Sequence, residues 1–450
     1  MTRILLLATT TGYQTRSFGD AAERLGVELV FATDRCDKID DPWRDGAIPI
    51  RFFDEDRSVA SIVESAATRP IDGILVAGDR PTVIAARVAQ ALGLPGHPPA
   101  AAAIARNKEM MRARLRDAGL AVPWFRSVTL GSQLAAAGDQ PLTYPCVIKP
   151  VALSGSRGVM RADDPRSFVE AFERLRALLG SPDVRAERND AHDRILIESF
   201  VPGREYAIEA ILHHGTLHVI AIFDKPDPLD GPFFEETIYL TPSAAPPEVQ
   251  HAIAGGVQAA AKAIGLHHGP IHAECRVHPS TGEVFVVEVA ARPIGGLCAR
   301  VVRFADGTSL EHALLRHAIG ESPESWTRES RASGVMMIPI PRRGILRRVE
   351  GIDAARAVPG VDDVRITAKT DQTLIPLPEG ASYLGFIFAR ASEPGAVERA
   401  LRDAHARLTF VIDPELPVLT TVQTGYNHRA GAGPREGSTK TGPRERSKNV

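Results

Sequence analysis

The sequence predicts a protein of mixed α/β and α+β class, with a doubly wound N-terminal domain followed by larger α+β domains. Three observations favour this class. Apolar strand segments alternate with helical segments from residue 1 to about 95, which is typical of a small parallel sheet covered by helices. Beyond that point short strands and helices mix less regularly. The length of 450 residues suggests roughly three domains.

The N-terminal domain is expected to span residues 1–100. Its expected elements are, in order, the strand RILLLA, the helix SFGDAAERLG, the strand VELVFAT, the strand DGILVAG and the helix TVIAARVAQALG. The proline-rich segment from Leu94 to Pro99 ends this pattern. We expect one continuous helix over the next segment, residues 100–120.

The remaining chain is expected to hold two further domains, over residues 101–330 and 331–415. Helices are predicted at Pro165 to Leu179 and Pro247 to Ile264, among the strands YPCVIKP, RILIESF, EYAIEAIL and LHVIAIF. A last α+β unit ends with a helix from Ala396 to Arg407 and the strand LTFVID. Residues 424–450 are polar, glycine-rich and basic, so we expect a disordered tail.

Composition argues against several classes of protein. A net charge of −2 gives no electrostatic reason to expect nucleic acid as a partner. The apolar run near the N-terminus is too short for a signal peptide or a membrane span, and no longer one follows. The four cysteines form no metal-binding or CxxC spacing. We therefore expect a cytoplasmic protein that binds neither nucleic acid nor membrane.

One predicted β-hairpin carries two charges inside apolar strands. PIHAECRV and EVFVVEVA flank a turn centred on Thr281, and symmetric pairing about that residue would place Glu274 directly opposite Glu288. Like charges in that position repel, so a cation such as Mg²⁺ would resolve the conflict. Arg292, just past the second strand, would reach a phosphate. The alternative is an ordinary hairpin whose glutamates face solvent.

Two further elements have the composition of a nucleotide site. Lys149 ends an apolar strand and precedes a Ser/Gly-rich loop, whose backbone N–H groups could hold a phosphate. The chain has no Gly-Lys dipeptide, so this is no P-loop, and it has no GxGxxG fingerprint. In ESFVPGRE, free backbone groups at Ser199 and Val201 could pair with an adenine edge, and Glu205 could bind ribose. Each element alone also fits an ordinary turn.

Taken in order, these elements resemble the ATP-grasp superfamily over roughly residues 1–415. The order is a helical lysine at Lys108, the strand lysine with its glycine loop, the ExFVxGxE segment, and the two hairpin glutamates followed by Arg292. The resemblance implies an ATP-grasp fold, in which two subdomains over residues 101–330 grip ATP behind an N-terminal Rossmann-like domain and before a C-terminal α+β ligase domain. It implies ATP as cofactor, with one or two Mg²⁺ ions for which Mn²⁺ can substitute.

The resemblance also assigns roles to residues. The ATP-binding set is Lys108, Lys149, Ser154, Gly155, Ser156, Gly158, Val159, Glu198, Ser199, Phe200, Val201 and Glu205. The metal ligands are Glu274 and Glu288, the catalytic residues are Arg292 and Lys225, and the substrate-binding residues are Glu236, Tyr239, Gly295 and Gly296. A third metal ligand, an asparagine in many members, is replaced by Ala290, which leaves the second metal position in question.

Within the superfamily, the segment from Phe223 to Ser243 looks like the substrate loop of L-amino acid ligases, which make dipeptides. The glutamate that helps to hold the amino-acid substrate there corresponds to Glu236, and a common histidine is replaced by Tyr239. The C-terminal segments GVMMIPIPRRGILRRVEG and LPEGASYLGFIFARA are similar to theirs. This resemblance implies an ATP-dependent ligase that joins a small carboxylate, an L-amino acid in the first instance, to an amine through an acyl phosphate, releasing ADP and phosphate.

Three alternatives stay open at this stage. A biotin-carboxylase-like or purine-pathway ATP-grasp enzyme would share the nucleotide site and differ in the substrate loop and C-terminal domain. A non-catalytic ATP-binding module is the third, suggested by Ala290. The expected partners are small-molecule carboxylate and amine substrates, and a homodimer is the candidate assembly.

Overall fold

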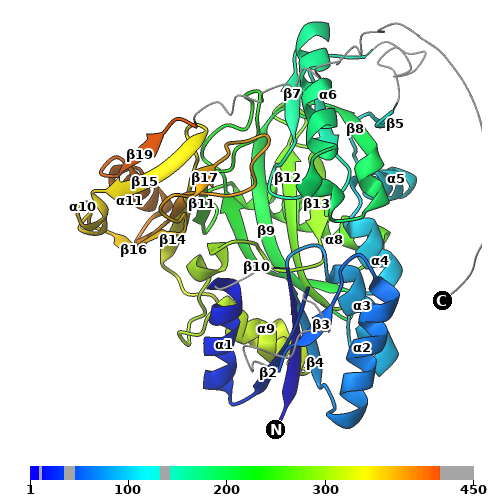
Figure 1. Cartoon of the computed structure of the whole chain (residues 1–450). Coiled ribbons are helices and arrows are strands. Elements are labelled where there is room, and N and C mark those ends of the chain that lie inside the picture. The colour runs from blue at the N-terminus through cyan, green and yellow to red at the C-terminus, as the bar shows by residue number, and fades with distance from the viewer. Residues whose placement is uncertain (10–12, 35–45, 132–141, 416–450) are drawn as a thin grey trace, which may run out of the picture. The chain divides into compact units, whose positions relative to one another are not determined.

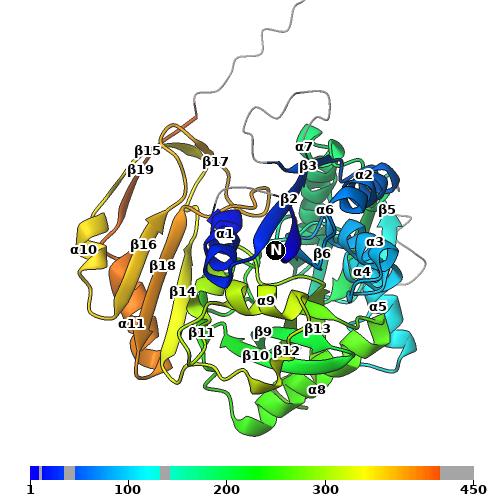
Figure 2. The same ribbon diagram turned by 90° about the horizontal axis from the view of Figure 1, so that it is seen from below.

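The N-terminal residues form a parallel four-stranded sheet buried on both faces. The computed structural model describes residues 1–9, 13–34, 46–131 and 142–415 (Figure 1). The strand order is β3-β2-β1-β4, and side chains of β1 point alternately to two cores. Helices α1 and α9 cover one face, while α2 and α3 cover the other (Figure 2). The elements are β1 (Arg3–Ala8), α1 (Tyr13–Leu25), β2 (Glu28–Asp34), β3 (Ile48–Ile50), α2 (Glu55–Thr68), β4 (Gly73–Ala77), α3 (Thr82–Leu92) and α9 (Leu310–Ala318).

A second, antiparallel sheet carries the glycine loop. Its strand order is β5-β8-β6-β7, and the apolar face of α6 packs on it through Phe172 and Leu175. Asp164 and Ser167 form a capping box that fixes the start of α6. The elements are β5 (Phe125–Thr129), β6 (Cys146–Pro150), β7 (Met160–Ala162), α6 (Pro165–Leu179), α7 (Pro182–Arg185) and β8 (Arg194–Ser199).

The largest sheet has eight strands, in the order β13-β12-β9-β10-β11-β14-β18-β16. One face of its first three strands packs against α4, α5 and α8 through an apolar core, and the opposite face of β9 joins the core beneath α1 and α9. The elements are α4 (Pro99–Ala105), α5 (Lys108–Asp117), β9 (Arg204–His213), β10 (Thr216–Asp224), β11 (Ile238–Thr241), α8 (Pro247–Ile264), β12 (Gly269–Val277), β13 (Val284–Ala290), β14 (Ala332–Ile338), β16 (Val361–Ile366) and β18 (Gly385–Ala391).

A three-stranded sheet, β17-β15-β19, completes the C-terminal region. Helix α11 packs on β14 and β18 through Val397 and Leu401, so the yellow and orange strands of Figure 1 continue the sheet begun by the green ones. The elements are β15 (Gly344–Glu350), α10 (Ile352–Arg356), β17 (Thr373–Leu374), α11 (Pro394–His405) and β19 (Thr409–Asp413), with short 3₁₀ turns at Asp190–Asp193, Cys298–Val301 and Pro323–Ser325.

The mixed α/β and α+β class is confirmed, but one expected helix is wrong. Residues 100–120 form two helices, because α4 ends at Ala105 and Asn107 caps α5 by accepting a hydrogen bond from the N–H of Met110. The break places Lys108 in the first turn of α5, where its N–H donates to Val151 O at 3.0 Å. The expected boundary at residue 100 falls inside α4, and the one at 330 precedes β14, which belongs to the same sheet as β9.

Three further predictions concern the C-terminal tail, the cysteines and membrane-spanning helices. The expected tail over residues 424–450 lies outside the described residues, as does Cys36. The three described cysteines, Cys146, Cys275 and Cys298, are buried free thiols. None of the helices in the described part of the chain has the length and apolar composition that crossing a bilayer requires.

Candidate active site

A cavity of ≈ 550 Å³ gathers most of the predicted site residues. Every predicted site residue except Gly158 and Lys225 lines this cavity. The lining comes from the N-terminal sheet, the glycine-loop sheet, the large sheet and the C-terminal segment that follows β16. Residues that are far apart in sequence therefore share one concave site, as binding sites between domains commonly do.

The charged hairpin has the predicted register. Glu274 of β12 lies directly opposite Glu288 of β13, and a β-bulge follows at Cys275. Each carboxylate contacts a lysine: Lys225 Nζ lies 3.1 Å from Glu274 Oε1, and Lys108 Nζ lies 3.1 Å from Glu288 Oε2. Both glutamates line the cavity, so the alternative of an ordinary hairpin with solvent-facing glutamates is wrong.

Three carboxylates surround one buried lysine. Lys225 Nζ donates to Glu205 at 2.7 Å, to Glu274 at 3.1 Å and to Glu236, and one oxygen from each of the three glutamates lies within 4.8 Å of the others. Burial alone would lower the pKa of Lys225, but the three carboxylates outweigh it and raise the pKa well above its usual value. We call Glu205, Glu236 and Glu274 the acidic cluster. Lys225 lies beneath the cavity lining and holds this cluster together.

The three glutamates of the acidic cluster share two cations. Lys225 donates to all three, and Arg276 Nε donates to Glu205 at 2.7 Å. Burial and the charge of Glu236 raise the pKa of Glu274. Although burial opposes it, the charge of Lys225 lowers the pKa of Glu236. Within the part of the chain that the structure describes, the cluster thus contains one more carboxylate than it has cationic partners.

The two lysines predicted to bind phosphate each contact a glutamate. Lys149 Nζ contacts Glu198 Oε2 at 2.6 Å, and Arg112 Nε contacts the other oxygen of that carboxylate at 2.7 Å. Burial lowers the pKa of Lys149 to about 8, although Glu198 opposes this shift. Lys108 donates to Leu153 O at 2.9 Å as well as contacting Glu288. Glu198, predicted to bind ATP, therefore positions Lys149 and Arg112 in the structure.

Four of the five predicted residues of the glycine loop line the cavity: Ser154, Gly155, Ser156 and Val159. Gly155 and Ser156 both adopt positive φ, at 64° and 54°, so successive N–H groups turn within the loop, a geometry that suits anions. Gly158 is placed elsewhere: its N–H donates to Pro378 O at 2.8 Å, and a Cβ there would lie 2.8 Å from Leu175. The C-terminal region thus holds the end of this loop.

The predicted adenine segment, Ser199 to Val201, lines the cavity with part of its backbone already engaged. The N–H of Ser199 donates to Trp124 O at 2.8 Å, and that of Phe200 donates to Pro145 O at 3.0 Å. Val201 O accepts from Arg276 Nη1 at 2.8 Å. The expectation of free groups at both positions is therefore wrong in part, and an adenine edge would have to pair with Ser199 O and the N–H of Val201. Glu205, the predicted ribose ligand, accepts from Lys225 and from Arg276 Nε at 2.7 Å.

Arg292 is held by a carboxylate of the N-terminal domain. Its Nε and Nη2 donate to the two oxygens of Asp79 at 2.9 and 3.1 Å, and its Nη1 donates to Pro293 O at 3.0 Å. Although burial opposes it, Arg292 lowers the pKa of Asp79. These bonds fix the plane of the Arg292 guanidinium. A guanidinium has five N–H groups, so two of them remain available to donate to a ligand.

Ala290 faces a histidine across the hairpin. The strand pairing sets His272 opposite Ala290, and both line the cavity. His272 Nδ1 lies 3.1 Å from Glu209 Oε2, which also accepts the N–H of Ile294 at 3.0 Å. A histidine oriented by a buried carboxylate therefore stands across from the position where many relatives carry an asparagine.

Several aromatic side chains line the cavity. The ring of Tyr239 is centred 5.2 Å from Lys225 Nζ, Tyr383 lines the cavity as well, and Phe234 lies beside Phe200. Gly296 has φ +63°, and a Cβ there would lie 3.3 Å from Phe386, so this position requires glycine. Gly295 lines the cavity beside it. The predicted substrate residues thus adjoin both Arg292 and the acidic cluster.

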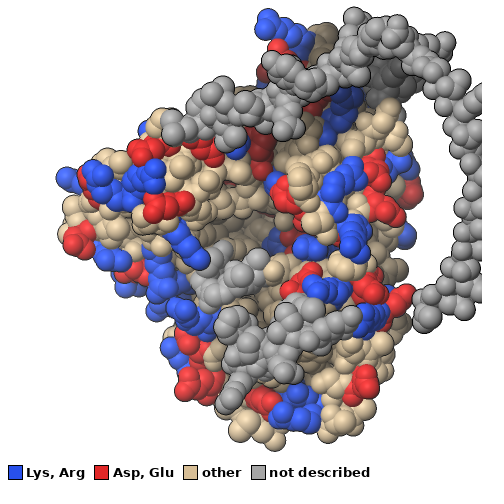
Figure 3. Space-filling view, in the orientation of Figure 1, with Lys and Arg blue, Asp and Glu red and all other residues tan. Residues whose placement is uncertain are grey.

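Five important residues were not predicted: Asp79, Arg112, His272, Arg276 and Tyr383. Asp79 is 213 residues from Arg292 in sequence, and nothing in the sequence couples the two. Arg112 follows Lys108 by one helical turn, which is a signal that could have identified it. Away from the cavity, basic and acidic side chains are interspersed over the face shown in Figure 3.

Three family profiles match consecutive parts of the chain. Residues 19–96 match the ATP-grasp N-terminal domain, residues 142–301 the ATP-grasp domain, and residues 336–413 the L-amino acid ligase C-terminal domain 2. A solved L-amino acid ligase from Bacillus licheniformis is 28% identical, with a TM-score of 0.78 over 92% of this chain and 99% of that one. The N5-carboxyaminoimidazole ribonucleotide synthetase of Thermotoga maritima, 16% identical with a TM-score of 0.65, covers 92% of this chain and 100% of its own and shows likeness of fold alone.

Curated proteins are also similar to this chain. An uncharacterised protein of Sinorhizobium fredii is 27% identical over 92% of this chain and 84% of its own length. The alanine–anticapsin ligase of Bacillus subtilis is 27% identical over 58% of this chain. The match spans 57% of that ligase, so little more than half of its length is comparable.

Proposed function

We propose that this chain, an ATP-grasp ligase resembling the L-amino acid ligases, joins a small carboxylate to an amine with ATP as the energy source. The predicted ATP-grasp fold, with its N-terminal and C-terminal domains, is confirmed by the family matches and by the solved ligase. The family and its ligase relatives support an ADP-forming carboxylate–amine ligase acting on small molecules. Our proposal adds the substrate class, an L-amino acid, and the roles of the residues.

The observation that carries the proposal is the arrangement of charge in one cavity. Cationic groups for a polyphosphate, Lys108, Lys149 and Arg292, share it with the opposed pair Glu274 and Glu288. The predicted amino-group ligand Glu236 lies beside Glu274, with one carboxylate oxygen of each within 4.8 Å of the other. Phosphate and amino-acid groups would thus be bound next to each other.

Mg²⁺ fits the two hairpin glutamates. ATP-grasp ligases use ATP and Mg²⁺ in general, and oxygen ligands from one or two carboxylates are what Mg²⁺ commonly takes from a protein. The three carboxylates of the acidic cluster face only two cations, Lys225 and Arg276, among the described residues. Glu274 and Glu288 would hold the ion, which would supply charge to neutralise the transferred phosphate. Ala290 offers no oxygen for a second ion.

The proposed reaction has two steps. A substrate carboxylate oxygen attacks the γ-phosphorus, an O–P bond forms, the bond to the β-phosphate oxygen breaks, and ADP leaves. The amine nitrogen then attacks the acyl carbon, the C–O bond to phosphate breaks, and the nitrogen loses a proton. Lys108, Lys149 and the glycine loop would hold the phosphates. Arg292, fixed by Asp79, would stabilise the charge that develops on the transferred group.

The proposal is tested by supplying L-amino acids singly and in pairs to the purified chain with ATP and Mg²⁺. We expect phosphate release that depends on the amino acids, ADP as the nucleotide product, and an amide identified by mass spectrometry. The Glu288→Gln protein, prepared in parallel, controls for contaminating ATPases. Formation of AMP and pyrophosphate would overturn the proposal, and a bicarbonate-dependent carboxylated product would favour the carboxylase alternative.

A further inference from the structure

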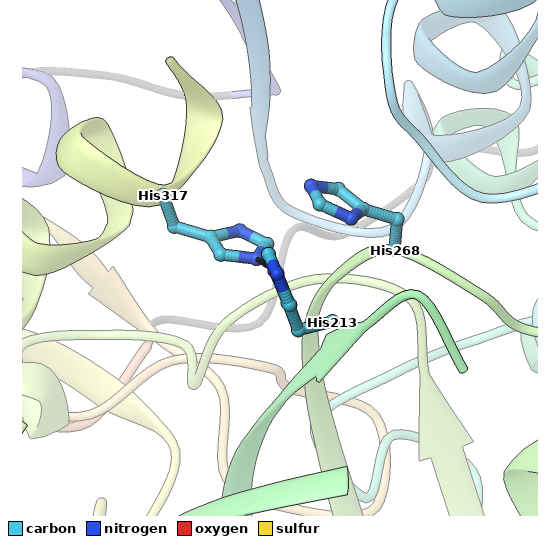
Figure 4. A group of neighbouring side chains, drawn as sticks. All are labelled: His213, His268 and His317. Carbon is cyan, nitrogen blue, oxygen red and sulfur yellow. Dashed lines mark hydrogen bonds between the residues drawn. The ribbon is translucent and has the colours of Figure 1, made fainter. Parts of the chain in front are cut away.

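Three histidines from separate segments meet at the far end of β9 from the candidate active site (Figure 4). His213 ends β9, His268 immediately precedes β12, and His317 lies in α9. One ring nitrogen from each lies within 4.8 Å of the others. We call these three residues the histidine cluster. Because His213 follows Glu205 by eight residues along the strand, the cluster lies about 26 Å from the acidic cluster.

Two of these nitrogens are hydrogen-bonded at a distance close to that of two ligands on one metal ion. His213 Nδ1 and His317 Nε2 form a hydrogen bond at 3.2 Å, in which one ring donates to the other. Imidazole nitrogens bind Zn²⁺ at about 2.0–2.1 Å in a tetrahedral arrangement. At those bond lengths, two ligand nitrogens are roughly 3.3–3.4 Å from each other. An ion could therefore replace the proton of this hydrogen bond with little change in the separation of the two nitrogens.

The third ring brings an unused nitrogen. His268 is 5% exposed, and among the described residues its buried Nδ1 has no hydrogen-bond partner. A buried polar atom without a partner is costly, and a bound ion would satisfy it. The His268 ring stacks on that of His317 with centroids 4.3 Å apart and an interplanar angle of 18°. A tilt of the His268 ring would direct a nitrogen at the ion.

The surroundings keep these imidazoles neutral, as metal binding requires. Burial, together with the neighbouring histidines, lowers the pKa of His268 to about 4 and that of His317 to about 3. Burial and the neighbouring histidines also lower the pKa of His213. Glu324, whose charge acts on His213 in the opposite sense, supplies a negative charge that favours a cation. At neutral pH His268 and His317 are therefore uncharged imidazoles, each with one lone pair.

We propose that His213, His268 and His317 bind one divalent transition-metal ion, with Zn²⁺ as the best fit and Co²⁺ or Ni²⁺ as substitutes. Three imidazoles suit these borderline ions and not Mg²⁺. The ion would link β9, the segment before β12 and α9, and it would stabilise the packing of α9 against the end of the large sheet. The ion would take no part in the proposed ligase reaction, because the acidic cluster lies at the other end of β9.

The test uses the full chain without a histidine tag, stripped of metal and kept in excess Mg²⁺ so that the carboxylates of the cavity are occupied. Titration with Co²⁺ should give the intense visible bands of a tetrahedral nitrogen site, saturating at one ion per chain. Zn²⁺ should abolish these bands by displacement and raise the melting temperature. His213→Ala and His268→Ala should each lose the bands and weaken Zn²⁺ binding by at least tenfold.

The matched control is His251→Ala, an exposed histidine on α8, which should leave Co²⁺ binding unchanged. Circular dichroism of the metal-free variants checks that they fold. Octahedral Co²⁺ spectra, no stoichiometric binding, or bands that survive in both cluster variants would overturn the proposal. Ligase activity should be equal in the His213→Ala and His251→Ala proteins, so this test is independent of the proposed reaction.

Discussion

Strand β9 ends in two clusters that have similar geometry and opposite electrostatics. At one end Glu205 joins the acidic cluster, and at the other His213 joins the histidine cluster. In both, three ligand atoms lie within 4.8 Å of one another. The acidic cluster is charged and contains a lysine that bonds to all three members. The histidine cluster is neutral and contains an unpartnered nitrogen among its described contacts.

The difference shows that proximity of ligands does not define a site's chemistry. Carboxylates that approach each other must be neutralised by protons, by cationic side chains or by hard cations, and the acidic cluster uses Lys225 and Arg276. Imidazoles can approach each other without charge, and a buried group of them can accept a borderline metal directly. The chemistry of the ligand atoms therefore suits the acidic cluster to a hard cation or an ammonium group and the histidine cluster to a borderline metal.

The largest expected effect comes from the charged hairpin. Glu288→Gln conserves volume and removes one of two opposed charges, so we expect phosphate release to fall by roughly several hundred-fold, on the order of 4 kcal/mol. Co²⁺ binding at the histidine cluster should not change. Glu283→Gln, an exposed position on the same hairpin, is the control. Turnover is measured by steady-state phosphate release. A near-normal value for Glu288→Gln would show that the hairpin does not bind a catalytic metal ion.

The next effect tests whether the acidic cluster binds an amino group. Glu236→Ala removes the carboxylate proposed to pair with the substrate ammonium, so we expect the KM for the amino substrate to rise by roughly 30-fold or more. The KM for ATP should change by less than about twofold. Glu235→Ala is the matched control, because that side chain is adjacent in sequence and does not line the cavity. Equal changes in both KM values would point to a general disturbance of the cavity.

A smaller effect is expected at the phosphate end. Lys149→Ala should weaken ATP binding by about 10- to 100-fold, since a charge-assisted hydrogen bond contributes roughly 1.5–3 kcal/mol. It also leaves Glu198 with Arg112 as its ion-pair partner, so stability should be measured beside affinity. Calorimetric titration of ATP gives the dissociation constant. Lys262→Ala, an exposed lysine on α8, should bind ATP like the unchanged chain.

The sequence predicted those features that depend on local pattern. Alternation and a symmetric turn were sufficient to set Glu274 opposite Glu288, and the lysine followed by a Ser/Gly-rich loop identified one wall of the cavity. The split of residues 100–120 into two helices was missed, because Asn107 was not recognised as a helix cap. The signal was present, since asparagine before a helical segment is a strong N-cap.

Features that depend on long-range contacts could not be predicted. The clamp of Arg292 by Asp79 joins two domains, and the three members of the histidine cluster come from segments up to 104 residues apart. The backbone at Ser199 and Val201 was expected to be free, but its partners, Trp124 and Arg276, come from other elements. The sequence shows which groups are present, while their partners are set by tertiary packing.

The smallest effect is a pH dependence that separates the two ends of β9. Burial lowers the pKa of Lys149 to about 8, so in the ligand-free chain this ammonium is charged below pH 8 and loses its proton above it. The apparent dissociation constant for ATP should therefore rise by about tenfold between pH 7 and pH 9, as one proton must be regained on binding. The Lys149→Ala protein should lack this rise.

The histidine cluster should show no such dependence. The pKa of His268 is about 4 and that of His317 is about 3, so both are already unprotonated in this range, and Zn²⁺ affinity should stay level over the same interval. An ATP affinity independent of pH in the unchanged chain would show that Lys149 does not meet the phosphates as a titrating group.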